Sequence, residues 1–232
     1  MIDLPALLTF GFIGTTLLCF LILVLSLLNS DEVRIRKRAH SVALILMTWL
    51  IFQSTLGLNK WYQDRLATPP HMIFPILMAI VVMLILFLTP RGRRFIDGLS
   101  IRTLTMLQVV RVPVEVCLWC LAMNRQVPWS MTFEGRNFDI LIGLSAPIIA
   151  IWGWKKGKLS KKVILAWNIL GMILLLQVVV TGIGALPSPL QWWEFQQPNL
   201  AVMYFPFVWL PAFIVPCAAL SHLVSIRRLI KK

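Results

Sequence analysis

Long uncharged stretches, separated by short clusters of basic residues, recur along this chain of 232 residues. Apolar stretches of 18 residues or more are typical of transmembrane helices. The pattern predicts an all-α, polytopic membrane protein, with residues 1–232 forming a single domain of seven transmembrane helices. We expect the spans at residues 4–29, 41–59, 70–89, 103–123, 136–154, 163–185 and 201–224.

The basic residues are divided unequally between the two predicted sides of the membrane. Of the 22 Lys and Arg residues, 17 follow the first, third, fifth and seventh spans, and four lie on the other side. Because an excess of Lys and Arg marks the cytoplasmic side, we expect the N-terminus outside and the C-terminus in the cytoplasm. The first stretch lacks a basic leader and is too long for a signal-peptide core, so we expect it to be retained as a span.

The composition agrees with a multi-pass protein of a bacterial cytoplasmic (inner) membrane, whose main partner is the lipid bilayer. Only 13% of the residues are charged and 59% are hydrophobic, whereas soluble domains have about 25% charged residues. The net charge of +13 lies in short clusters between spans, so it predicts orientation, and no nucleic-acid partner is expected. The oligomeric state cannot be derived from the sequence.

The fourth predicted span is unusual because it carries charges near its middle. Arg111 and Glu115 are four residues apart, and Gln108 shares their helical face. Each charge costs about 2.5–3.5 kcal/mol at the bilayer centre, so this face should turn toward other helices. One interpretation is a structural ion pair between Arg111 and Glu115, and the other is a site for a solute or a proton.

Polar residues also gather where the fifth predicted span begins. These are Glu134, Arg136, Asn137 and Asp139. The uncharged run that follows, residues 140–154, is too short to cross a membrane alone, so Asn137 and Asp139 should lie below the lipid headgroups. If Arg111 and Glu115 do not pair with each other, the charged members of this group are their nearest candidate partners. A solvated helix entrance, with acids favoured by the helix dipole, is the alternative.

Further polar residues fall in the outer halves of other predicted spans, which favours a cavity open to the outside. They include Gln177 in the sixth span and Asn199 and Tyr204 in the seventh. The candidate binding residues are therefore Gln108, Arg111, Glu115, Glu134, Asn137, Asp139, Gln177, Asn199 and Tyr204. Ordinary hydrogen bonds between helices are the alternative, above all for Gln53 in the second span.

These residues support a protein that binds, and by one interpretation transports, a small polar or ionic solute or a proton. Two other classes stay open. One is a membrane-embedded enzyme acting on a lipid or polyprenyl substrate with Glu115 or Asp139 as acid–base, and the other is a structural subunit of a larger membrane complex. Catalysis is the weaker interpretation, since the sequence reveals no nucleophile, and no catalytic residue is assigned.

No cofactor or metal ion is expected. Cys117 and Cys120 lie roughly 120–180° around the helix from Arg111 and Glu115, and no second cysteine pair exists to exchange electrons with them. The three histidines lack carboxylate or thiol neighbours at the spacing of a metal site. The absence of lysine from the predicted spans argues against a retinal Schiff base.

Prolines predict irregular helices in two spans. Pro113 cannot donate to the carbonyl of Val109, so a disturbance is expected within the turn that contains Arg111. Pro206, Pro211 and Pro216 recur at five-residue intervals, so the seventh helix is expected to be bent or broken.

Weak similarity between the two halves of the chain suggests an internal repeat. A basic residue precedes Gln53 and Gln177 by 15 positions in both halves, and Phe-Pro pairs open the spans that follow. By this interpretation, residues 1–90 and 133–230 are parallel repeats joined by a linker helix at 95–123, an arrangement that is found in transporters.

Several strings suggest a family. They are Arg111-Val-Pro-Val-Glu115, the stretch 133–140 with Ser145-Ala-Pro147, and Gln197-Pro-Asn199 with the stretch 204–211. With these strings the chain resembles an uncharacterised family of seven-helix bacterial membrane proteins. The resemblance covers most of the chain and implies the membrane class, but it implies no function.

Overall fold

The computed structural model describes residues 5–231, and these residues form helices joined by short loops. The α-helices are α1 (Ala6–Leu28), α2 (Val33–Leu58), α3 (Ile73–Leu88), α4 (Pro90–Asp97), α5 (Ile101–Met106), α6 (Arg111–Met123), α7 (Asp139–Ile148), α8 (Lys161–Gly184) and α9 (Val215–Ile230). Single 3-10 turns occur at Trp61–Gln63, Leu107–Val110, Trp129–Met131 and Ala201–Met203, and π-helical segments at Ile149–Lys155 and Leu210–Ile214.

The predicted all-α class is confirmed, and each predicted span contains a helix. Five stretches are long and apolar enough to cross a membrane, and α3 with α4 adds a sixth if the two form one broken span. The five are Ala6–Leu28, Val33–Leu58, Ile101–Met123, Lys161–Gly184 and Leu210–Ile230. With its π-helical extension, the fifth predicted span is helical only over residues 139–155, which is shorter than the roughly 20 residues that a bilayer requires.

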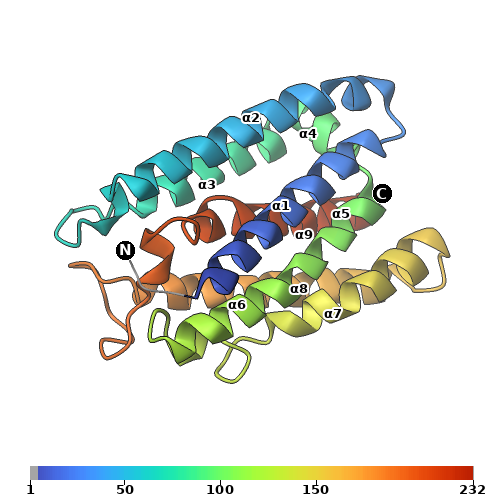
Figure 1. Ribbon diagram of the computed structural model, residues 1–232. Helices are drawn as coiled ribbons and strands as arrows, with labels where there is room; N and C mark the ends of the chain where they lie inside the picture. Colours follow the sequence, from blue (N-terminus) through green and yellow to red (C-terminus); the bar gives the residue numbers. More distant parts are fainter. Residues whose placement is uncertain (1–4, 232) are drawn as a thin grey trace.

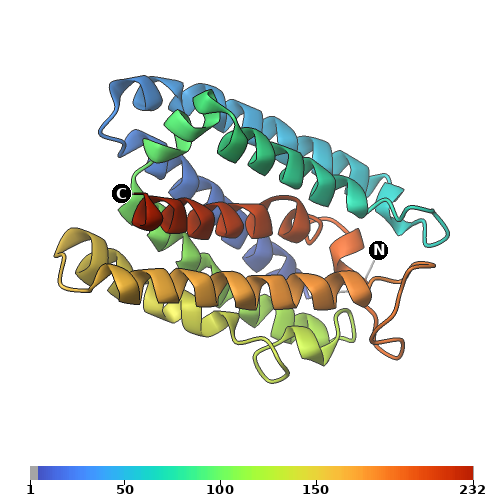
Figure 2. The ribbon, with the colours of Figure 1, turned by 180° about the vertical axis from the view of Figure 1, so that it is seen from behind.

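The long helices run back and forth between two ends of the molecule (Figure 1). One end holds the α1–α2 loop, α4, the α7–α8 loop and the C-terminal end of α9, which Figure 2 shows from behind. Together with the first turns of α2 and α5 and the residues that flank the α7–α8 loop, these segments carry most of the basic residues, so we call this the basic end. The α2–α3, α6–α7 and α8–α9 connections lie at the opposite end.

α2 and α3 lie together along one edge of the bundle (Figure 2). Large apolar side chains are exposed along both helices, including Leu44 and Ile45 on α2 and Ile85 and Leu88 on α3. Soluble monomers seldom expose apolar patches this extensive. This surface is typical of helices that face lipid.

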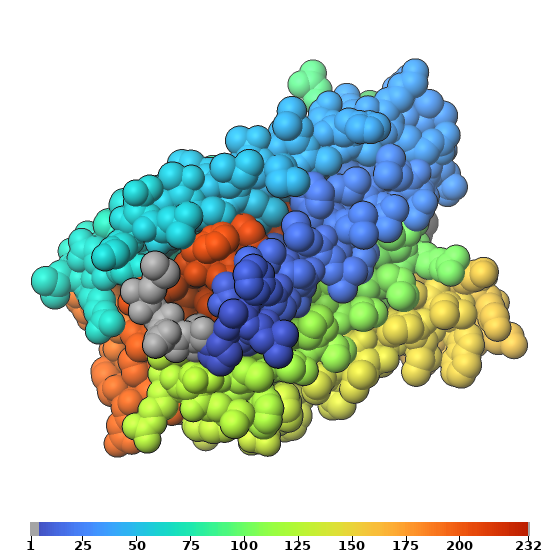
Figure 3. Space-filling view, in the orientation of Figure 1, coloured from blue at the N-terminus to red at the C-terminus, as the bar shows by residue number. Residues whose placement is uncertain are grey.

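α1 packs against α2, α5 and α6, and the space-filling view shows α1 (dark blue) flanked by α2 on one side and α6 on the other (Figure 3). Its buried face places Phe12 beside Phe207, with ring centroids 4.9 Å apart. The opposite face carries exposed Leu7 and Phe10. This division into one buried and one apolar exposed face again fits a helix between protein and lipid.

Helix α4 was not predicted. α3 and α4 meet at an angle of 89°, and Thr89 caps α4 by accepting a 3.0 Å hydrogen bond from the backbone N–H of Gly92. A Cβ atom on Gly92 would lie 2.4 Å from the carbonyl oxygen of Ile85 and 2.7 Å from backbone atoms of Leu86. Glycine is therefore what allows α4 to fold back this closely against α3.

The end of α4 is held by basic residues near the end of α9. Asp97 accepts hydrogen bonds from Arg227 at 2.9 and 3.1 Å and from Lys231 at 2.9 Å, and Arg228 donates to the carbonyls of Ile96, Asp97 and Leu99. Partial burial raises the pKa of Asp97, but the hydrogen bonds from Arg227 and Lys231 outweigh it and lower the pKa below its usual value. The basic C-terminal segment thus anchors the elbow formed by α3 and α4.

Prolines disturb helices where the sequence predicted it. The turn before Pro113 is 3-10 rather than α-helical, over Leu107–Val110, and the span that contains Pro211 starts with a π-helical segment. The predicted bounds of the seventh span were wrong: the long helix runs from Leu210 to Ile230, whereas residues 204–208 are non-helical and mostly buried. In addition, the α-helix gives way to the π-helical segment Ile149–Lys155 just after Pro147. Proline cannot donate the usual helical hydrogen bond, so it disturbs the regular α-helical pattern there.

Gln53 forms a structural hydrogen bond, as the alternative to a cavity residue predicted. It is fully buried, and its side-chain oxygen accepts a hydrogen bond from the hydroxyl of Tyr62. Burial raises the pKa of Tyr62, and the hydrogen bond to Gln53 offsets this only in part. Gln53 therefore joins α2 to the loop that follows it.

Candidate functional site

A buried polar cluster lies where α6, the start of α7 and the middle of α8 meet. Arg111 begins α6, and its guanidinium donates a 2.7 Å hydrogen bond to Asp139, the first residue of α7. The same guanidinium points two nitrogens at the carbonyl of Gly171 in α8, at 3.3 and 3.4 Å. Arg111 is 4% exposed and Asp139 is also 4% exposed, so the ion pair is enclosed by protein.

The interpretation of Arg111 and Glu115 as an ion pair is wrong, and the alternative partner Asp139 is the one that Arg111 contacts. Among the described residues, Arg111 has only Asp139 as an ion-pair partner within 4.0 Å. The close packing of α7 on α6 explains this, because a Cβ on Gly143 would lie 2.8 Å from the side chain of Val112 and 3.3 Å from the Cβ of Arg111. Asp139 begins the same helix and is brought to Arg111 by this contact.

Glu115 has a neutral partner. It is 1% exposed, and one of its oxygens accepts a hydrogen bond from the side-chain amide of Asn137, which also donates to the carbonyl of Met131 at 3.0 Å. The other oxygen of Glu115, Oε2, is buried and has no hydrogen-bond partner in the part of the chain that the structure describes. Asn137 also accepts a 3.1 Å hydrogen bond from the backbone N–H of Asp139, so it connects the Glu115 carboxyl group to the backbone at the start of α7.

Two residues that the sequence analysis did not include adjoin this cluster. His222 of α9 is fully buried, and its Nδ1 lies 2.9 Å from the side-chain oxygen of Asn168 on α8. A Cβ on Gly171 would lie 2.4 Å from the His222 ring. Gly171, whose carbonyl accepts from Arg111, therefore also leaves the space that the ring occupies. Asn168 interrupts an apolar span three residues before Gly171, and that spacing was an available signal.

The cluster is closed to solvent in this conformation. The loop between α6 and α7 covers it, because Asn137 turns back to Met131 and Phe133 stacks on Trp119 with ring centroids 6.2 Å apart. The indole N–H of Trp119 is also buried without a partner among the described residues. The α6–α7 loop therefore lies between Glu115 and the solvent at the opposite end.

The structure places the remaining predicted residues apart from the charged centre. Gln108 donates to the carbonyl of Ala218 on α9 at 3.0 Å, and Asn199 donates to that of Gly182 on α8 at 3.2 Å. Tyr204 is half-buried and packs against the apolar core.

Two predicted residues are exposed near the α6–α7 loop. Glu134 is exposed. Gln177 is also exposed, and its amide donates to the carbonyl of Arg136 at 2.6 Å. The buried centre of the predicted set is therefore Arg111, Glu115, Asn137 and Asp139.

Other binding features are located elsewhere. Within residues 5–231, no group of three or more His, Cys, Asp or Glu side chains is placed to hold a metal ion. Two surface pockets lie at the basic end, one lined by residues of α2 and α4 and the other by Asn29 and residues at the start of α5.

Comparison with known proteins yields a family but no described function. No characterised protein and no solved structure is significantly similar to the chain. A family model described as a domain of unknown function, DUF8737, matches residues 69–230, which run from the loop before α3 almost to the end of α9. Since the match covers more than half of the chain, the protein belongs to this uncharacterised family, as the resemblance implied.

Proposed function

We propose that the protein spans the cytoplasmic membrane of a bacterium seven times, with its N-terminus outside, and binds and moves a small polar or ionic solute. Glu115 is the central binding group: it either releases and takes up a proton or accepts a hydrogen bond from the solute. Arg111 and Asp139 hold the helices around it, and Asn137 orients the carboxyl group. The outward-facing cavity belongs to a second conformation, in which the α6–α7 loop has moved away.

The observation that carries this proposal is the unpartnered oxygen of Glu115. A buried polar atom without a hydrogen bond costs about 1–3 kcal/mol, and more when it belongs to a charged group. Ionisable groups inside membrane bundles are rare and commonly mark solute or proton paths. Glu115 Oε2 is such an atom, whereas the other oxygen of Glu115 accepts a hydrogen bond from Asn137.

Replacing Glu115 with Gln tests the assignment. The amide preserves the size of the side chain, so we expect the variant to fold. We expect solutes that raise the melting temperature of the purified wild-type protein to bind Glu115→Gln at least about tenfold more weakly, corresponding to the loss of one hydrogen bond to a charged group. Thermal-shift titrations against a panel of small anions, cations and amino acids measure this.

Glu134→Gln is the matched control, since Glu134 is an exposed carboxyl group at the same end. It should bind solutes like the wild type. Equal binding by wild type and Glu115→Gln would show that Glu115 is only structural. A panel in which no solute stabilises the wild type would count against solute binding altogether.

The proposed orientation has a separate test. Leu66, in the α2–α3 loop, and Lys158, in the α7–α8 loop, are both exposed. In a background without the four native cysteines, Leu66→Cys should react with a membrane-impermeant thiol reagent added outside intact cells. Lys158→Cys should react only after lysis, because its loop belongs to the basic end. Labelling of both from the same side would contradict the seven-span arrangement.

A further inference from the structure

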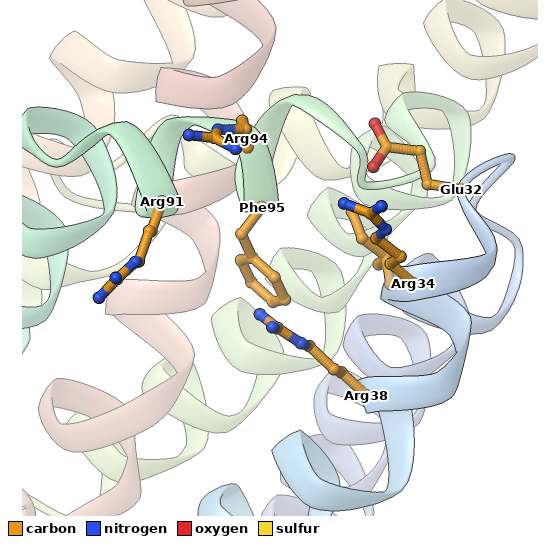
Figure 4. Close-up of a pocket in the computed structure, with 7 residues that line it drawn as sticks. Glu32, Arg34, Arg38, Arg91, Arg94 and Phe95 are labelled. Atoms are coloured by element: carbon orange, nitrogen blue, oxygen red, sulfur yellow. The ribbon is translucent and has the colours of Figure 1, made fainter.

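A pocket at the basic end is lined by four arginines. Arg34 and Arg38 come from the first turns of α2, and Arg91 and Arg94 come from α4. Figure 4 shows Arg38 reaching from α2 toward the ring of Phe95 on α4, whereas Arg34 points toward Glu32. The cavity measures about 270 Å³, enough for a small anionic group with several waters, since one water occupies about 30 Å³ of liquid.

The four arginines have no counter-charge of their own. In the described chain, none of them forms an ion pair within 4.0 Å or a side-chain hydrogen bond. Glu32 is the one acid in the lining, so the pocket keeps an excess of positive charge. Other arginines of this end are engaged: Arg36 donates to the carbonyl of Ser30 at 2.6 Å, and Arg227 pairs with Asp97.

The walls of the pocket are held by close packing. A Cβ on Gly98 would lie 2.0 Å from the side chain of Ile35 and 3.1 Å from the carboxyl group of Glu32. Gly98 therefore lets the start of α2 approach the end of α4 closely. Gly92 fixes α4 against α3 in the same way, and the hydrogen bonds to Asp97 anchor its other end. The spacing between the two arginine pairs is thus set by the fold.

Exposed apolar surface begins within about two helical turns of the arginines. Leu44 and Ile45 lie about two turns after Arg38 on α2, and Leu88 is the last residue of α3, three positions before Arg91 in the chain. α4 is bent 89° from α3, so it runs across the direction of the spans. A molecule with an anionic head and apolar chains matches this order of surfaces, whereas a fully soluble anion would use only the arginines.

We propose that this pocket binds the phosphate headgroup of an anionic phospholipid, whose acyl chains lie along α2 and α3. Arginine presents forked N–H donors that match phosphate oxygens in pairs. Basic pockets between helices on the cytoplasmic side are where anionic lipid headgroups bind membrane proteins. The proposal rests on the proposed membrane orientation but is independent of solute binding at Glu115.

Lipid binding to the purified full chain tests the proposal. The probes are dioctanoyl-phosphatidylglycerol, dioctanoyl-phosphatidylcholine, glycerol phosphate and inorganic phosphate, titrated in non-ionic detergent and followed by native mass spectrometry. We expect the wild type to bind the anionic lipid at least about tenfold more tightly than the zwitterionic lipid, as one or more charge-assisted hydrogen bonds would provide. The variant with Arg34, Arg38, Arg91 and Arg94 all replaced by Gln should lose this preference.

A control variant removes the same charge elsewhere at the basic end, by replacing Lys155, Lys156, Lys158 and Lys161 with Gln. It should keep the preference, and the double variant Arg34→Gln/Arg91→Gln should weaken it if the fourfold variant does not fold. Equal losses in the lysine and arginine variants would overturn the proposal, because the effect would then follow net charge. Binding of inorganic or glycerol phosphate as tight as that of the lipid would also overturn it, by assigning the pocket to soluble anions.

Discussion

Replacing Arg111 with Met is expected to lower the free energy of unfolding by about 3–5 kcal/mol, because it leaves the carboxyl group of Asp139 buried without its partner. The two groups form a 2.7 Å ion pair in which both side chains are about 5% exposed. Denaturation of the purified protein in mixed micelles measures the change. Arg136→Met is the control: Arg136 is exposed and stacks over Trp193, so its loss should cost less than about 1 kcal/mol.

The double variant Arg111→Met/Asp139→Asn should recover much of this stability, since a buried ion pair is often no more stabilising than well-packed neutral residues. Recovery identifies Asp139 as the partner of Arg111. If the double variant is as unstable as Arg111→Met, the contact of the guanidinium with the Gly171 carbonyl matters more than the ion pair.

The second large effect is expected at the elbow between α3 and α4. Gly92→Ala would place a Cβ 2.4 Å from the Ile85 carbonyl oxygen, and backbone atoms cannot move aside as a flexible side chain does. Overpacking of this kind costs about 1–3 kcal/mol, occasionally more. We expect a lower melting temperature and faster proteolysis of the segment around α4.

Gly14→Ala provides the comparison, because a Cβ on Gly14 in α1 would meet nothing within 4 Å. Alanine is favoured over glycine in helices by about 0.5–1 kcal/mol, so this variant should be unchanged or slightly more stable. Similar melting temperatures for Gly92→Ala and Gly14→Ala would mean that α4 does not depend on this close contact.

Hydrophobic patterning predicts the helices here, but it does not predict how they end. Each of the seven predicted apolar stretches contains a helix, because the pattern identifies the residues that are buried in protein or lipid. α4 was missed because its sequence, Pro90 to Asp97, is basic. Its helix depends on the Thr89 cap and on room at Gly92, neither of which is visible as a hydrophobic stretch. The late start of the seventh helix, at Leu210, was missed because residues 201–209 are just as apolar.

The charged members of the site could be predicted, with Asp139 among the candidate partners of Arg111, but the sequence could not decide between Asp139 and Glu115. An unusual charge in an apolar span identifies Arg111 and Glu115 whatever the fold. Which carboxyl group meets Arg111 depends on how closely α7 approaches α6, and this was set by Gly143. The spacing of four residues between Arg111 and Glu115 allowed a local pair, but tertiary packing supplied Asp139 instead.

α9 is held at two neighbouring points between its middle and its C-terminal end, about one and a half turns apart. Near its middle, the ring of His222 fits against Gly171, and near its end Arg227, Arg228 and Lys231 bind the end of α4. Because α9 is a continuous helix between these points, a movement at one contact is transmitted to the other. Any rearrangement that separates α8 from α9 must therefore either pull the His222 ring away from Gly171 or move α4 together with α9, so that the position of the α3–α4 elbow depends on the contact between α8 and α9.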